Sequence, residues 1–197
     1  MTHLCKQARI GAVSKCGSST IPHHQNLEKV GIGMSQKRNG VKTLAANAIV
    51  MALYIVLSLV LPFSSGAIQF RLSESLNHLV VFNRKLLWGV LGGVIVYNLL
   101  FGFGPLDVLF GGGQTLLALA LTASLHKVVP NIKMRLALNV LFFTASMFLI
   151  AIMLTITAEL PFWMTFGTTA LSEFIIMSIS APIMYWINKT VRIEEQV

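Results

Sequence analysis

After its first 40 residues, the chain alternates between long apolar runs and short polar connections. Six apolar segments follow one another, at about 44–61, 68–82, 86–101, 106–125, 136–156 and 162–187. Most are close to the length of about 20 residues that an α-helix needs to cross a bilayer. The pattern therefore predicts an all-α, polytopic integral membrane protein with six transmembrane helices.

Composition agrees with a membrane protein and argues against nucleic-acid binding. The mean hydropathy is +0.74, with 55% hydrophobic and only 11% charged residues, whereas soluble domains carry about 25% charged residues. The net charge of +8 comes from Lys and Arg in the short connections between apolar runs. Membrane proteins carry such residues on the cytoplasmic side, so we expect the lipid bilayer, and no nucleic acid, as a partner.

The same basic residues predict a topology with both ends of the chain inside (N-in/C-in). With the N-terminus inside, only Arg71 falls on the outer side, and this count holds only if segment 68–82 is a span. From Met34 onward, ten basic residues then lie on the cytoplasmic side: Lys37, Arg38, Lys42, Arg84, Lys85, Lys127, Lys133, Arg135, Lys189 and Arg192.

The remaining parts of the chain carry little chemistry. Residues 1–40 lack sustained periodicity and contain many turn-forming residues, so we expect a disordered basic tail before a membrane domain at 41–192 and a short cytoplasmic tail at 193–197. One hypothesis is that translation begins at Met34. Detection of peptides from upstream of Met34 in the native protein would contradict it. Cys5 and Cys16 lack the close spacing of a zinc site, and we expect neither metal nor cofactor.

No motif of a known catalytic site is present. The chain lacks the phosphate-binding pattern G-x-x-x-x-G-K-[ST], the metalloprotease pattern H-E-x-x-H and the nucleophile pattern G-x-S-x-G. We therefore predict no catalytic residue and no enzyme activity. A membrane enzyme or enzyme subunit is an alternative, with Arg71, Glu74, Asp107 and Glu173 as acid/base groups, although no paired nucleophile or metal-ligand spacing supports it.

Charged residues inside predicted spans are the candidates for function. Each costs at least about 2.5 kcal/mol at bilayer depth, so such residues usually face the protein interior. Arg71 and Glu74 are spaced to share one helix face, with His78 one turn beyond. They form either a structural ion pair or one wall of a binding site. Glu173 has no basic residue within ten positions, so it needs a partner from another helix or from a ligand.

The third and fourth segments add polar and flexible positions. Asp107 opens the fourth segment, where it either stabilises the helix N-terminus or belongs to the site. Asn98 and Gln114 are amides at bilayer depth, and the glycines 111–113 permit either tight helix packing or contact with a flat ligand. Together these groups predict an outward-facing pocket for a planar, nitrogen-rich solute.

Three stretches resemble the QueT family, the substrate-binding (S) components of energy-coupling-factor (ECF) transporters. They are "GAIQFRLSESLN", "NRKLLWGVLGGVIVYNLL" and "GPLDVLFGGGQTLLALALTA", and the likeness covers roughly residues 44 to 190. One departure is "GGGQT", where the family pattern leads us to expect a small residue and threonine, so Gln114 is a local variation or part of substrate choice. The family pattern falls here on Gly66, Ala67, Ile68, Gln69, Arg71, Ser73, Glu74, Asn98, Gly104, Asp107, Phe110 and Gly111.

The resemblance implies a concrete transport function. S components are six-helix proteins of the bacterial cell membrane that bind a vitamin-like solute from outside. They then join a transmembrane coupling protein and two ATPases, whose ATP hydrolysis drives uptake. For this family the implied cargo is a deazaguanine precursor of queuosine, of the preQ0 or preQ1 type.

The resemblance also suggests roles for single residues. Gln69 and Glu74 would bond the guanine-like edge, and Arg71 would orient Glu74 or the solute carbonyl. Glu173 would bond exocyclic N–H groups or pair with a cationic aminomethyl substituent. Ala48 and Ala52 form a small-xxx-small pair that permits close helix approach. S components use such alanines to dock on the coupling protein, although apolar helices also contain this spacing by chance.

Two further alternatives stay open at this point. A stand-alone secondary transporter for another small nitrogen-rich solute would need neither ATPases nor an alanine docking face, and co-purification with ATPase subunits separates it from an S component. A purely structural membrane scaffold leaves the four costly intramembrane charges unexplained.

Overall fold

The computed structural model describes residues 22–60, 71–102 and 104–196, with side chains described from Gly40 to Glu194. These residues are helical or in short connections, with no strand among them. The chain divides into two units, residues 1–37 and residues 38–197. Helix α1 (Pro22–Val60) begins in the first unit and ends in the second.

Five helices of the described residues are long and apolar enough to cross a membrane. They correspond to the predicted first, third, fourth, fifth and sixth segments, which confirms the all-α, polytopic class. The spans are Gly40–Val60 in α1, Arg84–Phe101, which includes α3 (Leu87–Phe101), then α4 (Pro105–Leu125), α5 (Ile132–Ala158) and α6 (Phe162–Val191).

The predicted second span has a different structure. Its described part is a 3-10 helix, η1 (Leu72–His78), followed by the short helix α2 (Leu79–Phe82), which together hold 11 residues. That is well below the roughly 20 residues of a spanning α-helix. All residues from Leu76 to Phe82 are buried, so this segment packs inside the bundle, where its polar side chains meet partners from other helices. Residues 68–70 lie outside the described part.

Side-chain contacts show that this short segment runs back along α1. Ser58 donates a hydrogen bond to Ser73, and Asn47, eleven residues earlier on α1, donates to the backbone carbonyl of Lys85. Eleven residues of α-helix rise about 16 Å. Between Ser73 and Lys85, the chain therefore returns from the level of Ser58 to the level of Asn47.

Helix α3 then starts beside Asn47 and runs parallel to α1. The two helices approach closely at two glycines of α3. A Cβ atom on Gly89 would lie 2.7 Å from the Asn47 carbonyl oxygen, and one on Gly93 would lie 2.6 Å from Cβ of Tyr54. Both distances are too short for any side chain, so glycine is required for this packing.

Local signals in the sequence set the ends of the later helices. Gly104 has a φ of 107°, a conformation that glycine adopts at little cost, and Pro105 follows as the first residue of α4, where proline is favoured. Asn131 caps α5 by accepting a hydrogen bond from the Lys133 backbone N–H. Left-handed Glu159 ends α5 before Pro161 leads into α6.

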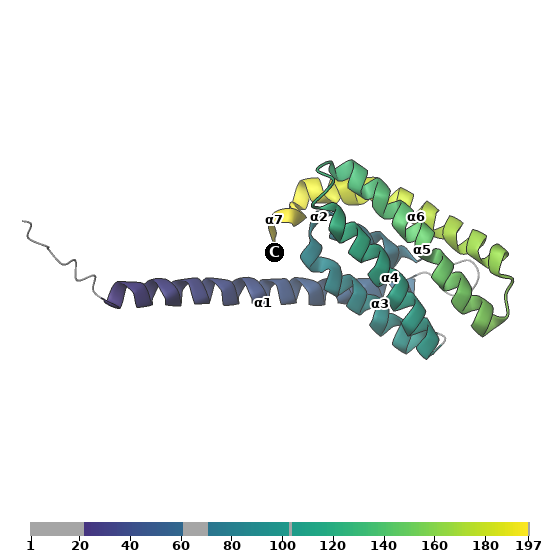
Figure 1. Ribbon diagram of the computed structural model, residues 1–197, viewed down its shortest axis with the longest axis horizontal. Helices are drawn as coiled ribbons and strands as arrows, with labels where there is room; N and C mark the ends of the chain where they lie inside the picture. Colours follow the sequence, from purple (N-terminus) through teal and green to yellow (C-terminus); the bar gives the residue numbers. More distant parts are fainter. Residues whose placement is uncertain (1–21, 61–70, 103, 197) are drawn as a thin grey trace, which may run out of the picture. The chain divides into compact units, whose positions relative to one another are not determined.

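The short connections place α3, α4, α5 and α6 side by side as antiparallel neighbours (Figure 1). The link between α4 and α5 returns to the end of the bundle near Asn47, because His126 contacts the Val80 carbonyl. The C-terminal helix α7 (Ile193–Gln196) reaches the same end, where Asn83 donates to the Ile193 carbonyl. We call this the basic end, because it carries Arg84, Lys85, Lys127, Lys133, Arg135, Lys189 and Arg192.

The predicted boundaries at residues 40 and 193 stay predictions, and each falls within or at the start of a helix. Residue 40, the predicted end of a disordered tail, falls within α1, which begins at Pro22; residues 1–21 lie outside the described part. At the other end, residue 193 was expected to begin a cytoplasmic tail. Ile193 is buried and opens α7, since its backbone N–H bonds the side chain of Asn188.

Candidate functional site

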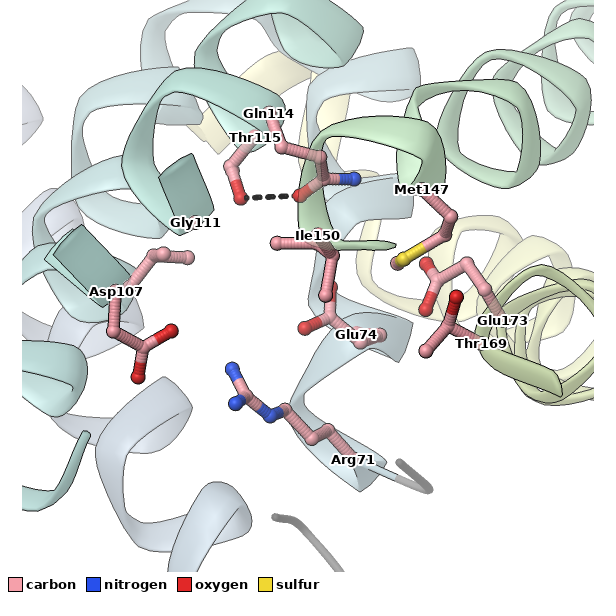
Figure 2. Close-up of a pocket in the computed structure, with 11 residues that line it drawn as sticks. Arg71, Glu74, Asp107, Gly111, Gln114, Thr115, Met147, Ile150, Thr169 and Glu173 are labelled. Carbon is pink, nitrogen blue, oxygen red and sulfur yellow. Dashed lines mark hydrogen bonds between the residues drawn. The ribbon is translucent and has the colours of Figure 1, made fainter. Parts of the chain in front are cut away.

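A polar cavity lies between the helices, in the half of the bundle away from the basic end. Its volume is about 20 Å³, which is room for about one water molecule. Figure 2 shows the guanidinium group of Arg71 extending toward the space between Asp107 and Glu74. The cavity is lined by Arg71, Glu74, Val94, Asp107, Gly111, Gln114, Thr115, Met147, Ile150, Thr169 and Glu173.

Five of the seven predicted binding residues line this cavity: Arg71, Glu74, Asp107, Gln114 and Glu173. They come from η1 and the residue before it, from α4 and from α6, so segments far apart in the sequence meet here. Asn98 lies behind the lining, and Gln69 lies outside the described residues. Because the cavity is lined from the N-terminal halves of α4 and α6 and the C-terminal half of α5, it is remote from the basic end.

Glu74 is held in a fixed orientation by two hydrogen bonds. Tyr54 on α1 donates its hydroxyl to Oε1 at 2.8 Å, and Asn77 donates its amide to Oε2 at 2.6 Å. Glu74 is only 7% exposed and Tyr54 is fully buried. Tyr54 is not among the predicted site residues, although a tyrosine within an otherwise apolar span is a usable signal, since a buried hydroxyl needs a partner.

Arg71 is placed by α3. Its guanidinium lies 5.3 Å from the ring centre of Tyr97, within the range of a cation–π interaction, and it donates to Oδ1 of Asn98 at 3.4 Å. His78, expected on the same face one turn beyond Glu74, instead contacts the Met177 carbonyl and the Asn139 amide. Arg71 and Glu74 therefore face the cavity, while His78 joins η1 to α5 and α6.

Asn98 and Asp107 form the junction between α3 and α4. Asn98 is 1% exposed and donates to the backbone carbonyl of Asp107 at 3.2 Å. Gly111 sits directly against the Asn98 amide, where a Cβ atom would clash. This supports the packing interpretation of the glycine run at Gly111, although Gly111 also lines the cavity. Asp107 lies in the first turn of α4 and presents its carboxylate to the cavity, so both of its predicted roles are compatible.

Gln114 connects the cavity to α5. Its amide nitrogen donates to the hydroxyl of Ser146 at 2.8 Å, and its oxygen accepts from Thr115 at 3.2 Å. The donor of Thr115 and the oxygen of Gln114 thus form a fixed polar edge, joined by a dashed line in Figure 2. Apolar side chains of Val94, Met147 and Ile150 supply the other walls.

Glu173 is the least satisfied polar group of the cavity. It lies 11 residues after Phe162, the first residue of α6, or about 16 Å along the helix. It is 2% exposed, and its Oε1 has no hydrogen-bond partner among the described residues. The predicted need for a partner from another helix or a ligand therefore stands, because none of the described helices supplies one to this oxygen.

The remaining lining residues carried no signal in the sequence. Thr115 and Thr169 are threonines within apolar helices, where the hydroxyl usually bonds a carbonyl of the preceding turn, as Thr169 does with Thr165. Met147 and Ile150 are indistinguishable from other core residues by sequence alone. Within the described residues, no group of three His, Cys, Asp or Glu side chains comes together as a metal site would require.

The model of the QueT transporter family matches residues 44–189. This chain belongs to the QueT family. A curated relative, the queuosine precursor transporter QueT of Lactococcus lactis subsp. cremoris (strain MG1363), is 36% identical over 165 residues, which cover 79% of this chain and 97% of the relative. No solved structure matches the chain.

QueT membership confirms the resemblance drawn from the three sequence motifs. Together with the long apolar helices, it identifies the chain as a multi-pass transport protein of the cell membrane. The family is one of transporters, which favours a transport protein over a membrane enzyme.

Proposed function

We propose that this protein captures a queuosine precursor of the deazaguanine type from outside the cell and acts as the S component of an ECF importer. The observation that carries the proposal is the buried cavity, in which three carboxylates, one guanidinium and one carboxamide converge. The relative from Lactococcus lactis is named a queuosine precursor transporter, and 97% of its length is covered by the similarity.

The chemistry of the lining suits a planar heterocycle with several N–H donors. Carboxylates of Glu74 and Asp107 accept hydrogen bonds from ring and exocyclic N–H groups, and Arg71 donates to a ring carbonyl. The side-chain amide of Gln114 can both donate and accept hydrogen bonds. Val94 and Ile150 would contact the faces of the rings. In this arrangement Asn98 positions Arg71 and Asp107 from behind, and Gln69 remains a candidate for the guanine-like edge.

Binding of a bicyclic solute requires the lining to move. A cavity of about 20 Å³ accommodates about one water molecule, so side chains must withdraw before a deazaguanine fits. Arg71 has the longest side chain of the lining and Met147 a flexible, unbranched one, so these two would move most easily. The measured association rate should accordingly lie below that of a preformed, open site.

The proposed orientation puts both ends of the chain inside the cell. The bundle crosses the membrane with five long helices, and the buried segment from Ser73 to Lys85 supplies the sixth passage. The basic end then faces the cytoplasm, as the positive-inside rule requires, and the cavity lies in the outer half. An accessibility experiment with cysteines at Lys127 and Glu159, on opposite ends of the bundle, tests this orientation.

The proposed partners are a transmembrane coupling protein and two ATPase subunits. Ala48 and Ala52 are exposed on α1, where small side chains permit close approach of another helix. The alternative is a stand-alone secondary transporter for another small nitrogen-rich solute. Co-purification of the chain with ATPase subunits supports the S component, whereas uptake in cells that lack those subunits supports the alternative.

The deciding experiment is a binding titration of the detergent-purified chain by calorimetry or tryptophan fluorescence. The ligands are the nitrile and aminomethyl deazaguanine precursors, queuine and guanine. Tight, stoichiometric binding of a precursor, with guanine much weaker, is expected. Folded protein that binds none of them would refute the cargo assignment. Glu74→Gln should weaken binding without changing membrane insertion, because it removes one carboxylate acceptor from the cavity.

A further inference from the structure

The lining of the cavity carries an excess of negative charge. Its charged members are the guanidinium of Arg71 and the carboxylates of Glu74, Asp107 and Glu173, which gives a formal charge of −2. Arg71 can balance one of the three carboxylates. The lining therefore holds two more acidic than basic side chains.

No other Lys or Arg among the described residues lines the cavity. The sequence has no Lys or Arg other than Arg71 between Thr43 and Asn83, and none at 86–126 or 136–188. This count includes the residues outside the described part, 61–70 and Phe103, which carry no charged side chain. The remaining basic residues of the domain lie toward the basic end of the bundle.

The three carboxylates differ in how far the protein satisfies them. Glu74 already accepts hydrogen bonds from Tyr54 and Asn77. Glu173 is 2% exposed, and its Oε1 has no partner among the described residues. The nearby hydroxyl of Thr169 donates to the Thr165 carbonyl at 2.8 Å. A buried carboxylate without a partner is costly. A cationic group of a ligand would therefore contribute most to the binding free energy at Glu173.

We propose that the site selects a cationic cargo, the deazaguanine with an aminomethyl group, and that Glu173 receives its ammonium. This inference rests on the proposed function. An ammonium has three donors and no acceptor, and it brings a positive charge to a site of formal charge −2. The nitrile precursor is neutral, and its terminal nitrogen is an acceptor that would face the lone pairs of a carboxylate.

Titrations of both precursors into the wild type and into Glu173→Gln test this proposal. A hydrogen bond to a charged group contributes about 1.5–3 kcal/mol, or roughly 10- to 100-fold in affinity. The wild type should therefore bind the aminomethyl precursor about 100-fold more tightly than the nitrile. Glu173→Gln should weaken only the aminomethyl complex and reduce the preference to below about tenfold. Its binding of the nitrile also shows that the variant is folded.

Glu159→Gln is the matched control, because Glu159 is an exposed carboxylate at the end of α5 that does not line the cavity. It should keep the full preference for the aminomethyl precursor. Equal or tighter binding of the nitrile by the wild type overturns the cationic cargo and leaves the proposed function intact. Equal loss of both ligands in Glu173→Gln also overturns it. Failure of the wild type to bind either precursor refutes the proposed function itself.

Discussion

The hydroxyl of Tyr54 donates a 2.8 Å hydrogen bond to the carboxylate of Glu74, and both side chains are buried. Tyr54 stands on α1, which contributes no residue to the cavity lining. A helix outside the cavity therefore fixes the orientation of one of its acceptors. The same helix exposes Ala48 and Ala52 on its outer surface, so the proposed docking helix and the proposed solute site share a direct contact.

Tyr54→Phe should weaken binding of the cargo about tenfold, because a hydrogen bond to a charged group contributes roughly 1.5–3 kcal/mol. Among the described residues, Glu74 then keeps only Asn77 as a hydrogen-bond partner and loses its fixed orientation. Calorimetry with the purified variant measures the change. Tyr185→Phe removes the same hydroxyl from an exposed position on α6 and should bind as the wild type does. Unchanged affinity in Tyr54→Phe would show that Glu74 does not need this bond.

The close approach of α1 and α3 makes a second prediction, on stability. Gly93→Ala should lower the thermal unfolding midpoint, since the new Cβ would lie 2.6 Å from Cβ of Tyr54, and overpacking typically costs about 1–3 kcal/mol. Gly113→Ala is the matched control, because nothing lies within 4 Å of its new Cβ. It should leave the midpoint unchanged or raise it slightly. Equal midpoints for the two variants would contradict the packing of α3 on α1.

Long apolar helices and buried charges were predictable from the sequence for the same reason. A bilayer admits few polar groups, so hydropathy alone places α4, α5 and α6 within a few residues of the predicted segments. A carboxylate such as Glu173 is conspicuous in that background. The kinds of side chain in the cavity could therefore be predicted from the sequence, whereas their arrangement could not.

Other features depend on tertiary contacts that no local pattern contains. The stretch after Arg71 has the apolar content of a weak span, yet it folds as η1 and α2 because Ser73 and His78 find partners on α1, α5 and α6. Asn98 was assigned to the lining, but its contact with Gly111 places it behind the cavity.

A third prediction concerns pH at the basic end. Burial lowers the pKa of His126 below its usual 6.5, the hydrogen bond to the Val80 carbonyl opposes this shift, and Arg135 and Arg84 add to it, while Glu194 acts against it. The folded state thus binds a proton at His126 less readily than the unfolded chain. Stability from this group is present above about pH 6.5 and decreases as the pH falls through that value.

The measurement is the thermal unfolding midpoint in detergent at about pH 7.5 and about pH 5.5, on either side of the ordinary histidine pKa. Protonation would direct an N–H of His126 at the Arg135 guanidinium, which lies 2.7 Å from Nδ1. His126→Gln should therefore show a smaller drop in midpoint on acidification than the wild type. Lys127→Gln, at the exposed neighbouring position, should retain the full drop. Identical drops in all three proteins would exclude His126 as the responsible group.

A fourth prediction separates binding of the cargo from its uptake. If α1 docks on a coupling protein through its small residues, leucines at Ala48 and Ala52 should block close helix approach. The double variant Ala48→Leu/Ala52→Leu should bind the deazaguanine with wild-type affinity, because neither residue lines the cavity. It should fail to co-purify with ATPase subunits and should lose uptake in cells.

Ala145→Leu, at an exposed alanine of α5, should keep cargo binding, co-purification and uptake. Full uptake by the double variant would place the docking surface elsewhere, whereas lost binding would show that α1 acts on the cavity directly through Tyr54.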